Sequence, residues 1–104
     1  MKPEISIHDS YVGIAKKVAA RCRRNLVGRT FGGWVVREVS EAKMSPYGPK
    51  EKWFAYFYIF VVNASQELVA EVRFRSDKSY DVSAQRDFPQ AALACISPSF
   101  REAM

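Results

Sequence analysis

Cations on one predicted helix are the first set of side chains in this sequence that could do binding chemistry. Five lie between positions 11 and 26, with no Asp or Glu among them. At about 100° per residue, four of them fall opposite the apolar positions and Arg21 falls at the edge. The five are Lys16, Lys17, Arg21, Arg23 and Arg24. This basic amphipathic pattern favours contact with phosphates or with an acidic protein surface. The alternative is a face that is merely solvated, but such a face usually mixes charges of both signs.

Aromatic rings and arginines on predicted strands form the second set. The stretch 53–62, WFAYFYIFVV, is a strand with two apolar faces, so its pattern leaves open which face is buried. We expect the hydroxyl-bearing face to lie outside, because tyrosine tolerates water at its tip. Strand 67–75 places Arg73 and Arg75 on the same face of the sheet as these tyrosines. Strand 34–39 can add Arg37 to that face. This set is Tyr56, Tyr58, Arg73, Arg75 and Arg37.

Two kinds of partner fit this second set. Aromatic rings among arginines hold single-stranded nucleic acid by stacking and phosphate contacts. The same residue types are enriched at the centres of protein–protein interfaces. A third possibility is that the C-terminal helix or the long loop 40–52 covers this face and makes it part of the core.

Catalytic and metal-binding patterns are absent from the sequence. The one histidine, His8, stands near the start of the chain, and the two cysteines, Cys22 and Cys95, have no Cys or His neighbour at metal-ligand spacing. Both cysteines fall on apolar sides of predicted helices, which indicates buried, reduced thiols in the cytoplasm. We therefore expect no enzyme, no metal and no cofactor.

The elements that position these residues follow from hydrophobic periodicity and breakers. Apolar residues three and four apart predict a helix over about 10–26, and strands alternate along the middle of the chain. The strands are expected at 34–39, 53–62, 67–75 and, more briefly, 80–83, with a second helix from Asp87. This order predicts an α+β domain over 1–104, with an N-terminal helix, a three- to four-stranded antiparallel sheet and a C-terminal helix.

Composition limits the class of protein. The 104 residues suffice for one domain, and 48% hydrophobic with 26% charged residues is typical of a globular chain. No apolar run approaches the ~18 residues of a membrane span, and no signal peptide is visible. Sixteen Lys and Arg against eleven Asp and Glu give a net charge of +5, which favours anionic partners.

These observations predict a small, basic, non-enzymatic binding module that contacts nucleic acid or another anionic partner. The alternative is a protein-binding inhibitor, immunity or accessory factor of bacterial or phage type. In that case the aromatic strand and loop 40–52, including Tyr47, form the interface. The long apolar strand also makes a homodimer possible.

Overall fold

A long amphipathic helix opens the chain. The computed structural model describes residues 7–45, 48–49, 52–77 and 79–103. Helix α1 (Ile7–Leu26) begins three residues earlier than predicted and ends where expected, before Gly28, whose φ of 89° suits glycine. Its apolar stripe is fully buried against the sheet, as predicted. The buried residues of the stripe are Tyr11, Ala15, Val18, Ala19, Cys22 and Leu26, with Ile14 half-buried beside them.

A single antiparallel sheet of six strands follows, in place of the three or four that we predicted. Its spatial order is β1-β2-β4-β5-β6, and β3 pairs with β4 on the same edge as β2. The strands are β1 (Thr30–Phe31), β2 (Trp34–Val39), β3 (Lys43–Ser45), β4 (Phe54–Val62), β5 (Glu67–Arg75) and β6 (Tyr80–Ala84).

The two strands that the sequence does not reveal are its shortest. Strand β1 forms a tight hairpin with β2 across Gly32 and Gly33, which both have positive φ. Strand β3 lies inside the segment 40–52 that we expected to be loop, and it pairs with the first residues of β4. Two or three residues are too few to show an alternating pattern, so both were missed.

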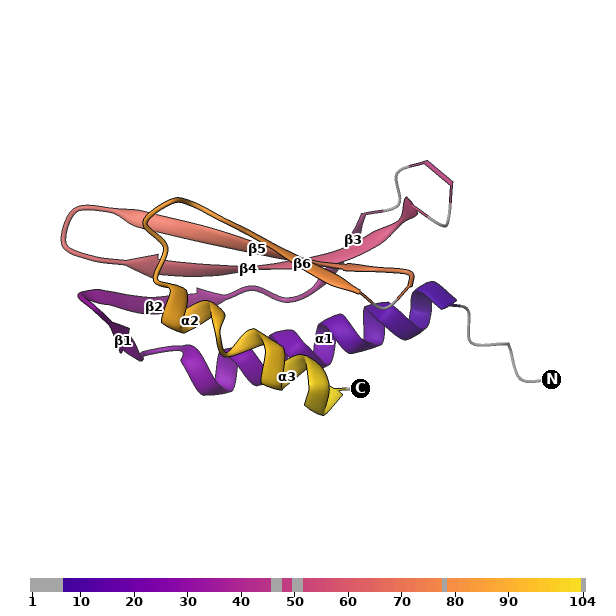
Figure 1. Ribbon diagram of the computed structural model, residues 1–104, viewed down its shortest axis with the longest axis horizontal. Coiled ribbons are helices and arrows are strands. Elements are labelled where there is room, and N and C mark those ends of the chain that lie inside the picture. The colour runs from indigo at the N-terminus through magenta and orange to yellow at the C-terminus, as the bar shows by residue number, and fades with distance from the viewer. Residues whose placement is uncertain (1–6, 46–47, 50–51, 78, 104) are drawn as a thin grey trace.

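The central strand β4 separates the two faces of the sheet. Its residues alternate without exception between buried and half-buried positions. The buried set is Ala55, Phe57, Ile59 and Val61, and β5 adds Leu68, Ala70, Val72 and Phe74 to the same face. Figure 1 shows α1, α2 and α3 together on one side of the sheet. The helices therefore cover this inner face, and we call the other face the open face.

The C-terminal helix predicted from Asp87 is in fact two helices, α2 (Gln90–Leu93) and α3 (Ile96–Ala103). Pro89 directly precedes α2, in an extended conformation. Pro98 lies in the first turn of α3, where its missing N–H is tolerated. Helix α3 packs on α1 and the sheet, and the rings of Phe100 and Tyr80 lie 4.6 Å apart. The C-terminal helices thus complete the core.

The two thiols are free, but their surroundings differ. Cys22 is fully buried in α1, and burial raises the pKa of its thiol to about 11. Cys95 lies in the break between α2 and α3 and is only half-buried, so our expectation of two buried thiols is wrong for Cys95.

A thiol reagent should therefore distinguish the two cysteines. In the native protein we expect Cys95 to react first, and Cys22 to react only after a denaturant is added, because it is both buried and protonated at neutral pH. Time-resolved labelling followed by mass spectrometry measures both rates, with Cys95→Ser as the control. Fast native labelling of Cys22 would contradict the packing of α1.

Candidate functional site

Four aromatic side chains form a continuous row along the open face of β4. Because residues two apart share a face of a strand, Phe54, Tyr56, Tyr58 and Phe60 stand side by side. Successive ring centroids lie 5.9, 5.6 and 6.0 Å apart. All four side chains are half-buried. The structure thus confirms that the tyrosine-bearing face lies outside, and it adds two phenylalanines that we did not single out.

No helix of the described residues lies over this aromatic row. The contacts of α1 and α3 are with the inner face and with each other, as Figure 1 shows. The described part of segment 40–52 includes β3, which extends the sheet at its edge. The possibility that the C-terminal helix covers this face is therefore excluded for the described residues. Tyr47 lies outside the described residues.

Two guanidinium groups lie over the ends of the aromatic row. The Arg73 guanidinium lies 4.5 Å from the centre of the Phe54 ring, and that of Arg37 lies 5.4 Å from the centre of the Phe60 ring. Both distances fit cation–π contacts. The predicted neighbourhood of tyrosines and arginines is thus present, with the arginines stacked on the phenylalanines.

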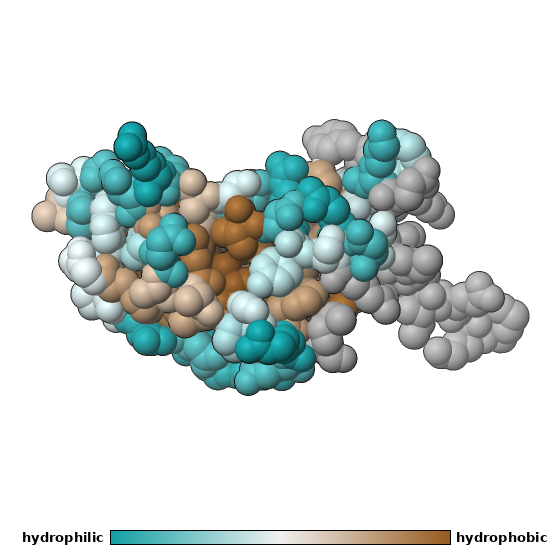
Figure 2. Space-filling model, in the orientation of Figure 1, coloured by the Kyte–Doolittle hydropathy of each residue, from teal (hydrophilic) through white to brown (hydrophobic). Residues whose placement is uncertain are grey.

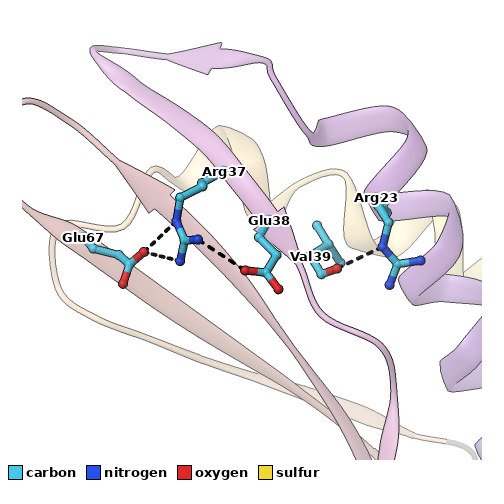
Figure 3. A network of polar contacts seen from close by, with 5 residues as sticks. All are labelled: Arg23, Arg37, Glu38, Val39 and Glu67. Carbon is cyan, nitrogen blue, oxygen red and sulfur yellow. Dashed lines mark hydrogen bonds and ion pairs between the residues drawn. The ribbon is translucent and has the colours of Figure 1, made fainter.

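Each open-face arginine that we predicted is also paired with a carboxylate. Arg37 donates through Nε to Glu67 (2.8 Å) and through a terminal nitrogen to Glu38 (3.3 Å), as Figure 3 shows. Arg73 Nε lies 2.8 Å from a carboxylate oxygen of Glu71. Arg75 pairs with Asp81 across strands β5 and β6. These pairs give the open face a nearly balanced charge.

Tyr58 is the most constrained member of the row. It lies directly opposite Glu71 on β5, so its side chain stands beside that carboxylate. Partial burial, followed by the negative charge of Glu71, raises the pKa of Tyr58. The Tyr58 backbone N–H donates to the Ser40 hydroxyl (2.8 Å). The backbone at Tyr58 is therefore bonded to Ser40, the residue that follows β2.

A small pocket lies at the Phe54 end of the row. Its volume is about 210 Å³. It is lined by Lys52, Trp53, Phe54, Arg73 and Arg75. The Trp53 indole N–H donates to the carbonyl of Gly48 (3.0 Å), which helps to position one wall. Sequence reasoning missed Lys52 and Trp53 because the pocket depends on where the loop meets β4.

The five α1 cations do not act as one set. Arg21 is ion-paired with Glu102 of α3 (2.9 Å), and Arg23 donates to the carbonyl of Val39 on β2 (2.9 Å, Figure 3). Both therefore hold α1 to its neighbours. Lys16, Lys17 and Arg24 are exposed, and within the described residues no ion pair involves them.

The free α1 cations and the aromatic row lie on opposite sides of the molecule. The apolar stripe of α1 faces the inner side of the sheet, so Lys17 and Arg24 lie on the side of the helix that is turned away from the sheet. Lys16 lies on the flank of the helix, where it lines a pocket with Arg23, Glu41 and Ala42. Lys16, Lys17 and Arg24 therefore cannot share one flat partner with Tyr56 and Tyr58. The residues that we predicted to form one site therefore form two separate surfaces, one on α1 and one on the open face.

These surfaces contain groups for binding rather than a cluster for metal chemistry. Within the described residues, no group of three or more His, Cys, Asp or Glu side chains could hold a metal ion. No helix in the described part of the chain is long and apolar enough to cross a membrane.

Comparisons with protein-family models, with curated proteins and with solved structures found no match to this chain.

Proposed function

We propose that this chain is a non-enzymatic protein-binding module whose partner docks on the open face. The observation that carries the proposal is the aromatic row, which packs on itself yet stays partly exposed to solvent. Tyrosine, phenylalanine and arginine are enriched at protein interfaces, and buried aromatic anchors supply most of the binding energy there. An inhibitor, immunity or accessory factor would use such a face.

The carboxylates favour a polypeptide over a nucleic acid on this face. A phosphate backbone laid along the aromatic row would meet Glu38, Glu67, Glu71 and Asp81 together with the arginines. Two like charges 4 Å apart repel by about 1 kcal/mol even in bulk water. A protein surface that carries both charges can instead form new ion pairs with these arginines and carboxylates. The existing exposed pairs are easily replaced, because each is worth only about 0–1 kcal/mol.

The rings are also not arranged for base stacking. Guanidinium groups already lie over Phe54 and Phe60. Tyr56 and Tyr58 meet nearly edge to face, at 68°. A base would have to displace these contacts, whereas a partner side chain can insert between the ring edges. The pocket beside Phe54, with cations from Lys52, Arg73 and Arg75, suits an acidic side chain of the partner.

A second candidate function belongs to α1. The observation that favours it is that Lys16, Lys17 and Arg24 are exposed and, within the described residues, free of ion pairs. Together with the net charge of +5, they suit an anionic partner such as nucleic acid, held by phosphate contacts that weaken steeply with salt. This surface is independent of the open face.

Affinity capture with two matched variants tests both candidates. The immobilised chain is exposed to extract of its native host at low salt, with and without nuclease. We expect wild type to retain a polypeptide despite nuclease treatment. The variant Tyr56→Ser/Tyr58→Ser should lose it, and Lys16→Gln/Lys17→Gln/Arg24→Gln should keep it, because only the first variant alters the open face.

The opposite pattern would contradict the proposed function. If wild type retains only nuclease-sensitive material, and the α1 variant loses it, the partner is a nucleic acid on α1. In that case raising the salt concentration should also release it. Thermal melting provides the control. The exposed α1 substitutions should change stability by no more than about 0.5 kcal/mol, and the Tyr56→Ser/Tyr58→Ser variant, which removes two half-buried rings, must still melt in one cooperative transition.

A further inference from the structure

We infer that the free edge of β6 is an interface at which a second copy of this chain adds its own β6, antiparallel, around Val82. Strand β6 ends the order of the sheet, and no described strand pairs with its outer side. The edge has little of the usual protection against pairing: Tyr80–Ala84 contains no proline, no lysine and no bulge, and its one charged residue, Asp81, is paired with Arg75. This inference does not depend on the proposed function.

Backbone bonds at the two ends of β6 show which groups are used within the chain. The Arg75 N–H donates to the Ser79 carbonyl (2.9 Å), and the Gln85 N–H donates to the Val69 carbonyl (3.4 Å). Opposed residues in an antiparallel pair alternate between bonded and non-bonded pairs. Between these two ends, therefore, the odd-numbered residues of β6 bond to β5.

The even-numbered residues of β6 turn their polar backbone groups outward. Tyr80, Val82 and Ala84 each direct an N–H and a C=O away from β5. A two-fold axis at Val82 would pair Val82 with its copy and Tyr80 with Ala84 of the second chain. Each such pair exchanges two hydrogen bonds. The edge is thus complementary to itself in a single register.

The side chains agree with the same register. On the open face, Asp81 would meet Ser83 of the second copy, whose hydroxyl can donate to the carboxylate while Asp81 keeps its ion pair with Arg75. On the other face, Val82 would meet its own copy. It is now 36% exposed, one of four exposed large hydrophobic residues among those whose burial the structure describes. No like charges are placed directly opposite each other.

The surroundings of β6 supply further apolar area. Figure 2 shows hydrophobic residues between the sheet and helices α2 and α3, on the side of the molecule where β6 runs. The opposite edge of the sheet is less suited to pairing, because β1 has two residues, β3 has three, and β2 is irregular between Val36 and Glu38. A β6 dimer would join two open faces into one surface.

Sedimentation of the full chain over a range of concentrations tests this inference. We expect wild type to approach the mass of a dimer as concentration rises. Val82→Pro should remain a monomer at every concentration, because proline removes the outward N–H at the axis but no bond to β5. Its melting must stay cooperative, which shows that the fold survives.

Two cysteine variants test the register, both in a Cys95→Ser background. Opposed bonded residues have Cα atoms about 5.5 Å apart, which a disulfide can span. Val82→Cys should therefore cross-link to a covalent dimer under mild oxidation. Ala84→Cys should not, because four residues of offset separate it from its copy by roughly 13 Å. A monomeric wild type at the highest soluble concentration, or cross-linking of Ala84→Cys alone, would overturn the inference.

Discussion

Val18→Asp should leave the chain largely unfolded at neutral pH. Val18 lies in the middle of α1 and has no exposed surface. To enter this site, Asp must take up a proton at pH 7, which costs about 4 kcal/mol for a pKa near 3.9. Losing the valine adds about 1.5 kcal/mol. The sum approaches the whole stability of an ordinary domain, about 5–15 kcal/mol.

The neighbouring residue provides the matched control. Lys17 is exposed on the same turn, so Lys17→Asp should change the free energy of unfolding by no more than about 0.5 kcal/mol. Urea unfolding followed by circular dichroism measures both variants. Lowering the pH toward 4 should partly restore Val18→Asp, since burial raises the pKa of the new carboxyl and favours its neutral form. If Val18→Asp unfolds at the same urea concentration as wild type, α1 packs through another face.

Tyr58→Ala should weaken binding of the protein partner by about 2 kcal/mol or more, which is roughly 30-fold in Kd. The ring stands in the middle of the aromatic row, between Tyr56 and Phe60, and it lies beside Glu71. Its removal opens a gap where a partner would be most fully desolvated. Calorimetric titration with the captured polypeptide measures the loss.

Tyr58→Phe separates the ring from its hydroxyl. This variant keeps the aromatic surface and loses only the hydroxyl group beside Glu71, so its effect should be smaller than that of Tyr58→Ala. Lys17→Gln, on the opposite side of the molecule, should leave Kd unchanged. Equal Kd values for wild type and Tyr58→Ala would exclude this ring from the interface.

Much of the inner architecture follows from sequence patterns alone. The three-and-four spacing from Tyr11 to Leu26 predicts the buried side of α1, and the alternation of strand 67–75 predicts its inner face. Strand 53–62 is apolar on both faces, yet the preference of tyrosine for partial exposure selects the outer side. These patterns are local, so the sequence carries them directly.

Other features depend on contacts between distant residues. Arg37 on β2 pairs with Glu67 on β5 only because β4 lies between these two strands, and Arg21 meets Glu102 only because α3 packs against α1. The balanced charge of the open face arises from such pairings, and composition alone suggests a basic surface instead. Cys95 lies between α2 and α3 and is half-buried, whereas the apolar pattern of its segment predicts a buried position.

Site-specific photo-cross-linking in the native host tests the open face as a protein interface most directly. A photoreactive phenylalanine analogue replaces Tyr58 in one variant and Lys17 in a second, so that one probe sits on the open face and the other on α1. The proposed function predicts that light links the Tyr58 probe to one defined polypeptide and leaves the Lys17 probe without that product. Cross-linking from Lys17 alone, or to nucleic acid alone, would contradict it.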